Sequence, residues 1–376
     1  MMAGNNGLML TLFIIFCIAA ALQLFYYLWF YLAPARSRDE VIGSSDSPVS
    51  VIICARNEAD NMRKFLPSVL EQDYPSFEVI VVNDCSEDGT DDLLGEMIVK
   101  YPNLRISSIN KDPKFTHSKK FAQFIGIKAA ENELLLFTDA DCMPDSPHWI
   151  RRMVSGFTDS TDFVLGYGGY IREKGLLNSY IRYDTFFIAM QYLGMALRGV
   201  PYMGVGRNLA WRKSVFFKNK GFGAHNHIAS GDDDLFVNAN ATGASTRVEF
   251  SQEAHTRSVP ASSVEAWIKQ KHRHLTTAGY YKLRDRLLLI LEPLSRVTFY
   301  GLFIVLISCL FMWPYILGVF GLRLIIQTII FYLISKKLNE KGNLIQSVIY
   351  DFFSPLINIS LYLSTFRNRA GNTKWK

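Results

Sequence analysis

Long apolar stretches at both ends of the chain restrict its fold more than any other feature of the sequence. Residues 8–33 carry no charge, and Arg36 and Arg38 follow directly. About 20 apolar residues are enough for a helix to cross the hydrocarbon core of a bilayer. The stretch lacks the basic start and the small-residue cleavage site of a signal peptide, and its aromatic end, residues 25–31, is typical of an interfacial belt. We therefore predict a retained transmembrane helix over residues 8–33, with its N-terminus outside.

A second apolar block covers residues 297–335 and is interrupted by a single charge, that of Arg323. The block is too long for one span of a bilayer. We therefore predict a hairpin of two transmembrane helices that turns near Trp313 and Pro314.

A third apolar stretch, residues 344–366, completes a C-terminal membrane segment over residues 297–366 but contains Asp351 and Pro355. If the hairpin starts and ends in the cytoplasm, one further crossing would place the basic C-terminal tail outside. Basic residues tend to stay on the cytoplasmic side. The stretch therefore lies in the interface or re-enters, or the hairpin is miscounted, and these alternatives stay open.

The middle of the chain, residues 48–260, alternates short β-branched runs with helical periodicity, which predicts an α/β domain with a mostly parallel sheet. The predicted strands are 49–54, 78–82, 104–109 and 134–138, and the predicted helices are 61–72, 91–100 and 119–130. No glycine-rich phosphate loop opens the first helix, which argues against a dinucleotide-dependent dehydrogenase and a P-loop enzyme. The net charge of +6 is modest. It favours an anionic membrane surface or a phosphate-bearing substrate over nucleic acid as the partner.

Polar residues follow three of the predicted strands at the point where each strand ends. They are Arg56, Asn57 and Glu58, then Asn83 and Asp84, then Asp139 and Asp141. Ligands of open α/β sheets bind at the carboxyl ends of the strands. The pair Asp139 and Asp141 suits a hard divalent cation, which prefers oxygen ligands, although two acids in a solvated turn would give the same pattern.

Three segments together resemble the signature of glycosyltransferase family 2, whose members have the GT-A fold. They are residues 50–58 (SVIICARNE), 81–90 (VVNDCSEDGT) and 138–141 (TDAD). The resemblance implies a donor site for a nucleoside-diphosphate sugar such as a UDP- or GDP-sugar. In that site Arg56, Glu58 and Asp84 bind the nucleotide, Asp139 lies near the ribose, and Asp141, with Asp139, holds Mg²⁺ or Mn²⁺ on the diphosphate.

Two further elements of that family resemble segments of this chain. Residues 118–122 (SKKFA) are similar to its G-K-x-x-A element and place Lys119 near the donor, with Ser118 in place of the usual glycine. Residues 231–235 (GDDDL) resemble its E-D-x-x-L element, whose aspartate is the catalytic base.

Leu235 sets the register of the second element and selects Asp232 as the base, with Asp233 as the alternative. A base must come within about 3 Å of the acceptor hydroxyl, and the repulsion among three adjacent acids would raise at least one pKa. An acidic surface loop is the competing interpretation.

Residues 270–274 (QKHRH) resemble the Q-x-x-R-W element of the membrane synthases of this family, such as cellulose and hyaluronan synthases. The resemblance implies that Gln270 and Arg273 bind the donor, and that Arg273 pairs with the leaving diphosphate. His274 stands on the acceptor side where the family has tryptophan, which makes a processive acceptor site less expected. Residues 261–296 are also predicted to form amphipathic helices that lie on anionic lipid.

Residues 204–211 (GVGRNLAW) resemble the loop on the acceptor side of the family. The resemblance implies that Asn208 and Trp211 contact the acceptor, with Trp211 stacked on a sugar. Ordinary packing of a turn and a strand is the alternative.

The sequence therefore predicts a multi-pass protein of the cell (inner) membrane with a cytoplasmic GT-A domain. We expect an inverting, metal-dependent glycosyltransferase that acts on a lipid-linked or other membrane-held glycan acceptor in cell-envelope synthesis. A processive polysaccharide synthase is the alternative within this class. From other classes, a catalytically silent membrane scaffold and a nucleotidyltransferase remain as competitors.

Overall fold

The computed structural model describes residues 2–37, 46–111, 118–226, 228, 230–342 and 344–367. Arg38 and the basic tail after Arg367, on which part of the predicted membrane topology depends, lie outside the described residues.

A seven-stranded sheet forms the centre of the middle domain, with the order β3-β2-β1-β4-β8-β6-β9. Its strands are β1 (Val49–Ala55), β2 (Phe77–Asp84), β3 (Leu104–Ile109), β4 (Leu134–Asp139), β6 (Phe163–Leu165), β8 (Leu209–Arg212) and β9 (Thr246–Val248). The first four strands pair in parallel, and β8 inserts antiparallel between β4 and β6. The predicted α/β class with a mostly parallel sheet is confirmed.

Helices cover both faces of this sheet because its apolar strands alternate their side chains between two cores. They are α3 (Ala59–Leu70), α4 (Thr90–Lys100), α5 (Lys119–Ala129), α6 (Trp149–Ser155), α7 (Leu176–Leu197), α8 (Lys213–Lys218) and α9 (Asp234–Asn240). Helix α10 (Val264–Leu275) packs instead against the long C-terminal helix Leu344–Arg367. Ile52 of β1 packs with Ala122 of α5 on one face, and Val51 packs with Met62 of α3 on the other. A second, small sheet has the order β5-β10-β7 and consists of β5 (Cys142–Pro144), β10 (Thr256–Ser258) and β7 (Gly168–Tyr170).

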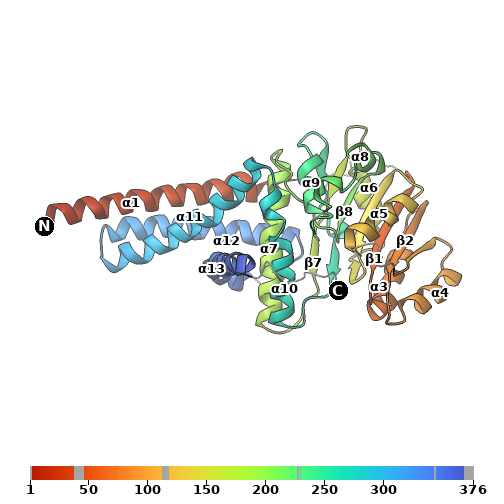
Figure 1. The fold of residues 1–376 in the computed structure, drawn as a ribbon. Coiled ribbons are helices and arrows are strands. Elements are labelled where there is room, and N and C mark those ends of the chain that lie inside the picture. The colour runs from red at the N-terminus through yellow and green to blue at the C-terminus, as the bar shows by residue number, and fades with distance from the viewer. Residues whose placement is uncertain are drawn as a thin grey trace.

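The two ends of the chain form long helices that come together. The first is continuous through α1 (Met2–Phe25), a π-helical turn η1 (Tyr26–Tyr31) and α2 (Leu32–Arg36); the others are α11 (Leu283–Ser308), α12 (Trp313–Lys337) and α13 (Leu344–Arg367). Within the described residues, four helical segments are long and apolar enough to cross a membrane, which indicates a multi-pass membrane protein. Helices α1, α11 and α12 run side by side away from the α/β domain (Figure 1).

Two expectations about these helices need correction. Helix α11 already begins at Leu283, so residues 283–296 belong to the first helix of the hairpin rather than to separate interface helices. The aromatic belt is wrong for Tyr26, Tyr27, Phe30 and Tyr31, which are at most 4% exposed. They are buried in the core that η1 shares with α7 and α12. The backbone of α7 approaches so closely that a Cβ at Gly194 would collide with the carbonyl oxygen of Phe30.

Candidate active site

The carboxyl ends of three parallel strands meet at one edge of the sheet. The register pairs Cys54 of β1 with Asp139 of β4, and Ala55 of β1 with Asn83 of β2. Asp84 ends β2 as a fully buried carboxylate, 3.7 Å from the guanidinium of Arg56. The predicted neighbourhood of these strand ends is therefore present in the structure.

The loops after β1 and β2 are tied to each other by their polar side chains. Asn57 adopts a left-handed backbone (φ 54°) and accepts a hydrogen bond from the amide of Glu87 at 2.8 Å. The amide of Glu58 donates to Thr90 Oγ1 at 3.1 Å, and its carboxylate accepts from Asn61 at 2.6 Å. Glu58 is thus held at the start of α3, beside the end of β2.

Lys119 links the strand edge to the acidic loop. Its Nζ lies 2.6 Å from Asp139 Oδ1 and 3.5 Å from Asp232 Oδ2. Ser118 is the N-cap of α5: its hydroxyl accepts a hydrogen bond from the amide of Phe121 and stabilises the start of the helix. Serine is therefore suited to the position where the family has glycine. Burial lowers the pKa of Lys119, but the carboxylates of Asp139 and Asp232 outweigh this effect and raise the pKa overall.

The pKa of Cys54, at the end of β1, is affected by the charged side chains of the site. Burial raises the pKa of its thiol. The charged side chains that act on the thiol are those of Lys119, Asp232, Asp139 and Asp84. The strand register places Asp139 beside Cys54, and Lys119 connects Asp139 with Asp232, so β4, α5 and the loop before α9 meet at the end of β1.

The three adjacent acids of the loop before α9 have different surroundings. Asp232 is 5% exposed, and its Oδ2 has no hydrogen-bond partner among the described residues. Asp233 caps α9 by accepting from the amide of Asp234 at 2.8 Å and from that of Gly206 at 2.6 Å. Asp234 accepts from two hydroxyls, those of Thr277 and Tyr281. Of the three carboxylates, that of Asp232 is the one with an oxygen that accepts no hydrogen bond among the described residues, and this Oδ2 is buried 3.5 Å from Lys119 Nζ.

Gly231 stands where the family has glutamate, and the backbone explains why. Its φ of 91° lies in the left-handed region, and a Cβ there would approach Leu235 to 2.5 Å. A glutamate would require a different loop.

Burial, together with the carboxylates of Asp232 and Asp234, raises the pKa of Asp233 to about 7.

The charges of two arginines from outside the sheet, Arg207 and Arg273, affect the pKa of Asp139. Burial raises the pKa of Asp139, but Lys119 and then Arg207 and Arg273 lower it, so the pKa is depressed overall. Arg273 is on α10, whose Gln270 donates to the hydroxyl of Tyr170 at 3.1 Å, while His274 is exposed.

Arg207 lies within the segment 204–211, but its residue type and spacing gave no signal of a role. Its guanidinium stacks on the ring of Tyr170 at 4.4 Å and donates to the carbonyl of Gly168 at 2.9 Å. A Cβ at Gly168 would collide with Arg207. Only the fold shows that this arginine, and not its neighbours, faces the site.

The predicted acceptor role is wrong for Trp211 and Asn208, both of which are 0% exposed. Trp211 is on β8, in the interior of the sheet, and its ring lies 4.0 Å from that of Phe137. The Asn208 amide accepts from Trp149 Nε1 at 3.0 Å and donates to the carbonyls of Tyr167 and Ala254. Both are core residues because β8 is covered on its two faces.

A candidate metal site lies at the end of β4. Ligand atoms of Asp139, Asp141 and Cys142 lie within 4.8 Å of one another. The two partly exposed carboxylates suit Mg²⁺ or Mn²⁺, which prefer oxygen ligands. Burial raises the pKa of the Cys142 thiol well above its usual range, and the thiol donates to Asp141 Oδ1 at 3.4 Å. The residues therefore fit a carboxylate-bound divalent cation with the thiol as a neighbour.

Comparison with known proteins gives consistent matches. The family model "Glycosyltransferase like family 2" matches residues 47–277, more than half of the chain. Glycosyltransferase AglE of Haloferax volcanii is 32% identical over 188 residues, which is 49% of this chain and 58% of AglE. The Escherichia coli enzyme UDP-Glc:alpha-D-GlcNAc-diphosphoundecaprenol beta-1,3-glucosyltransferase WfaP is 27% identical over 129 residues, 34% of this chain and 47% of WfaP. The chain thus spans less than two thirds of either relative.

Among solved structures, the mannosyltransferase PcManGT from Pyrobaculum calidifontis, in complex with GDP-Man and Mn²⁺, has a TM-score of 0.59. The match covers 89% of this chain and 100% of PcManGT at 18% identity. A likeness at this identity establishes a shared fold.

Proposed function

The chain belongs to glycosyltransferase-like family 2, and on that premise we propose that it transfers a sugar, with inversion, from a nucleoside-diphosphate sugar to a membrane-associated acceptor. The observation that carries the proposal is the gathering of Asp84, Asp139 and Asp232 with Lys119 around the end of β1. Carboxylates and a cation at this edge of the sheet provide both a nucleotide site and a base.

The donor would lie across the ends of β1, β2 and β4. Glu58 and Arg56, at the end of β1, would contact the nucleoside, and the buried Asp84 would hold Arg56 in place from the end of β2. Asp141 and Asp139 would hold the Mg²⁺ or Mn²⁺ ion, which neutralises the diphosphate when bound. Its presence with GDP-Man in PcManGT supports this assignment.

The leaving diphosphate gains negative charge as the bond to the sugar breaks, so cations that face it lower the barrier. Arg207 and Arg273 both act on Asp139 and are therefore close to the donor side of the site. Their planar guanidinium groups can bind phosphate oxygens in pairs. We assign both arginines to the leaving group, with Gln270 positioned one turn before Arg273 on α10.

Asp232 is the base in this proposal. It takes the proton of the acceptor hydroxyl while the hydroxyl oxygen attacks the anomeric carbon and the bond from that carbon to the diphosphate oxygen breaks. Its Oδ2, which accepts no hydrogen bond among the described residues and lies 3.5 Å from Lys119 Nζ, supports this role. Asp233 and Asp234 instead fix the loop through their hydrogen bonds.

The acceptor would come from the membrane, because the site adjoins the long helices. Helix α10, which carries Arg273 and the exposed His274, packs against α13. WfaP, by its name, acts on a diphosphoundecaprenol-linked sugar, which supports a lipid-linked acceptor here. Lys336 and Lys337 at the end of α12, beside the α/β domain, favour a cytoplasmic position for that domain.

The test uses the purified full-length protein in lipid, with a panel of labelled UDP- and GDP-sugars, a lipid extract as acceptor, and added or chelated Mn²⁺. We expect ion-dependent release of a nucleoside diphosphate and a labelled lipid whose new bond has the inverted configuration. A ladder of long products would instead indicate a processive synthase, and pyrophosphate a nucleotidyltransferase. Absence of transfer with every donor would leave the scaffold interpretation and overturn the proposal.

A further inference from the structure

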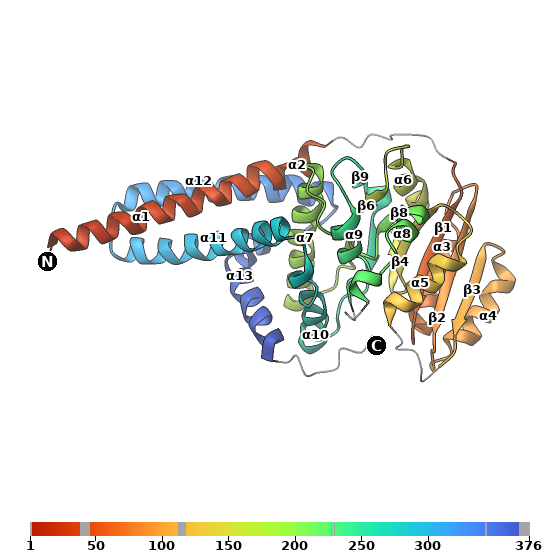
Figure 2. The ribbon, with the colours of Figure 1, turned by 45° about the horizontal axis from the view of Figure 1, so that its top comes forward.

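Helix α13 differs in direction from the other long helices. Figure 1 shows it nearly end-on below α12, and Figure 2 shows it running away from α11 in a direction that differs clearly from that of α1, α11 and α12, at the junction with the α/β domain. It contacts α7 and α10 of that domain as well as α11 and α12. Its length and hydropathy would allow it to cross a membrane, but its direction is not that of the bundle.

The two faces of α13 have an unusual polarity. The side chains that face the protein include small polar and acidic ones, whereas those that face outward are large and apolar. The buried group contains Ser347, Asp351 and Ser354, and the exposed group contains Ile345, Ile349, Phe353, Leu356 and Leu363. A water-exposed helix has the opposite arrangement. The outward face therefore needs an apolar partner.

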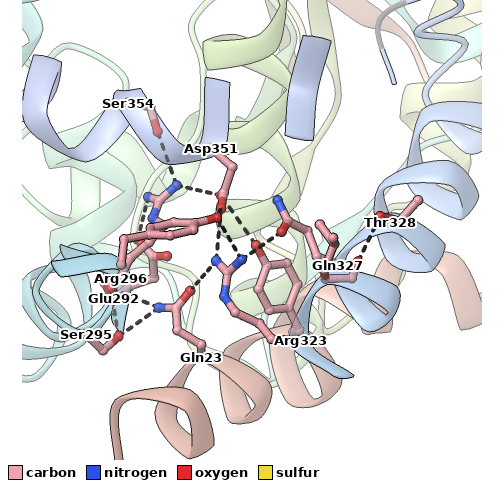
Figure 3. Close-up of polar contacts among 12 residues, drawn as sticks. Gln23, Glu292, Ser295, Arg296, Arg323, Gln327, Thr328, Asp351 and Ser354 are labelled. Carbon is pink, nitrogen blue, oxygen red and sulfur yellow. Dashed lines mark hydrogen bonds and ion pairs between the residues drawn. The ribbon is translucent and has the colours of Figure 1, made fainter. Parts of the chain in front are cut away.

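Charged residues buried between the helices hold α13 at this crossing (Figure 3). Asp351 accepts from Arg296 of α11 at 2.8 Å and from Arg323 of α12 at 2.9 Å. Arg296 also pairs with Glu292 at 2.9 Å. The two arginines and two acids balance in charge, and each is at most 2% exposed.

Helix α1 joins the same network. Gln23 accepts from Arg323 at 3.0 Å and donates to Ser295 of α11 at 2.7 Å. All four long helices therefore contribute to it. Charges at membrane depth must be paired. Movement of α13 out of this position would therefore leave Arg296, Arg323 and Asp351 buried without their partners.

We propose that α13 does not span the membrane but lies in its plane, with the exposed apolar face seated among lipid acyl chains of the leaflet next to the α/β domain. We infer lipid as the occupant because α13 contacts α12, a helix long and apolar enough to span a membrane, and α12 also exposes apolar side chains such as Ile329 and Leu333. The chain then has three spans, formed by α1, α11 and α12. The end of α13 lies on the same side as the α/β domain, so the conflict between a fourth crossing and the basic tail does not arise.

This proposal depends on membrane insertion and is independent of the proposed reaction. Labelling of single cysteines tests the predicted membrane topology of the chain. Three full-length proteins in sealed vesicles each keep one cysteine: the native Cys309, which is exposed in the turn between α11 and α12, a Ser262→Cys variant on the α/β domain, or a cysteine appended after Lys376. An impermeant maleimide should label the appended cysteine and Ser262→Cys from one side, and Cys309 from the other. Labelling of the appended cysteine together with Cys309 would establish a fourth span and overturn the proposal.

Depth measurements test the in-plane orientation. Nitroxide labels are placed, one protein at a time, at positions 345, 349, 353, 356 and 363, and collisions with oxygen and with a polar nickel reagent are compared. We expect similar depths, about 5–10 Å into the boundary between headgroups and acyl chains. A spanning helix would instead spread positions 345 and 363 over about 27 Å, at about 1.5 Å per residue. A steady change of depth along α13, or water exposure of all five labels, would contradict the proposal.

Discussion

Replacing Asp232 with asparagine should remove a proton acceptor and leave almost everything else unchanged. Oδ2 of this carboxylate accepts no hydrogen bond among the described residues, and Lys119, 3.5 Å from it, keeps a closer partner in Asp139 at 2.6 Å. Asparagine has the same shape, and the substitution relieves the repulsion with Asp233. We therefore expect the thermal midpoint of Asp232→Asn to equal or slightly exceed that of the unaltered protein.

The effect on catalysis should be large. A positioned base typically contributes about 10²–10⁴-fold to a rate, which corresponds to about 2.7–5.5 kcal/mol of barrier at about 1.36 kcal/mol per factor of ten. Asp233 cannot take over, because the amides of Gly206 and Asp234 occupy its oxygens. The expected loss in kcat is therefore at least about 100-fold, with the KM for the donor nearly unchanged because the nucleotide site is intact.

The assay measures initial rates of sugar transfer by the purified protein in lipid, over a range of donor concentrations. Asp92→Asn provides a matched control, since it makes the same substitution at an exposed carboxylate of α4, and it should keep the full rate. Full turnover by a folded Asp232→Asn protein would remove Asp232 from the role of base and refute the reasoning.

Three further predictions concern stability. The pKa of Asp233 is raised from 3.8 to about 7 in the folded protein, so the folded protein holds a proton that the unfolded chain releases. The resulting contribution to folding stability is complete below about pH 3.8 and is lost as the pH rises through about 7. Between pH 4 and pH 8, the thermal unfolding midpoint should therefore fall less in Asp233→Asn than in the unaltered protein. Asp351→Asn leaves Arg296 and Arg323 without their shared carboxylate and should cost about 3–5 kcal/mol; a denaturation midpoint unchanged in bicelles would contradict this. Trp211→Ala should cost about 3–5 kcal/mol as a core cavity, whereas a raised KM for the acceptor with an unchanged midpoint would indicate a surface role.

The centre of the fold could be predicted from the sequence because its signals are local. Each parallel strand is a short apolar run, and both faces of the sheet are buried, so the runs stand out from the helices between them. The predicted ends of β3 match the structure, and β1 and β4 differ from prediction by one residue. Since parallel strands share one carboxyl edge, the neighbourhood of Asp84 and Asp139 followed from the same pattern.

The position of β8 had no local signal. Its insertion between β4 and β6 depends on pairing between segments far apart in the chain. Trp211 and the preceding Asn208 are thereby buried, whereas Arg207 packs on the ring of Tyr170. A sequence pattern shows that a tryptophan follows a glycine-rich loop, but it does not show which side chains the neighbouring strands cover.

The orientation of α13 also depends on distant partners. Hydropathy identifies it as an apolar helix and marks Asp351 as a weakness in a span. The compensating charges of Arg296 and Arg323 come from two other helices. Because these arginines pair with Asp351 in the folded protein, the aspartate stabilises the position of α13.

The proposed donor site requires that Asp139 and Asp141, at the end of β4, bind a nucleotide sugar through a divalent ion. Calorimetric titration of the unaltered protein and of Asp141→Asn with UDP- and GDP-sugars, with and without Mn²⁺, measures this. We expect one class of donor to bind the unaltered protein only when Mn²⁺ is present, and Asp141→Asn to bind it at least about tenfold more weakly, a loss of about 1.4 kcal/mol. Equal donor affinity in both proteins, with or without the ion, would contradict the account.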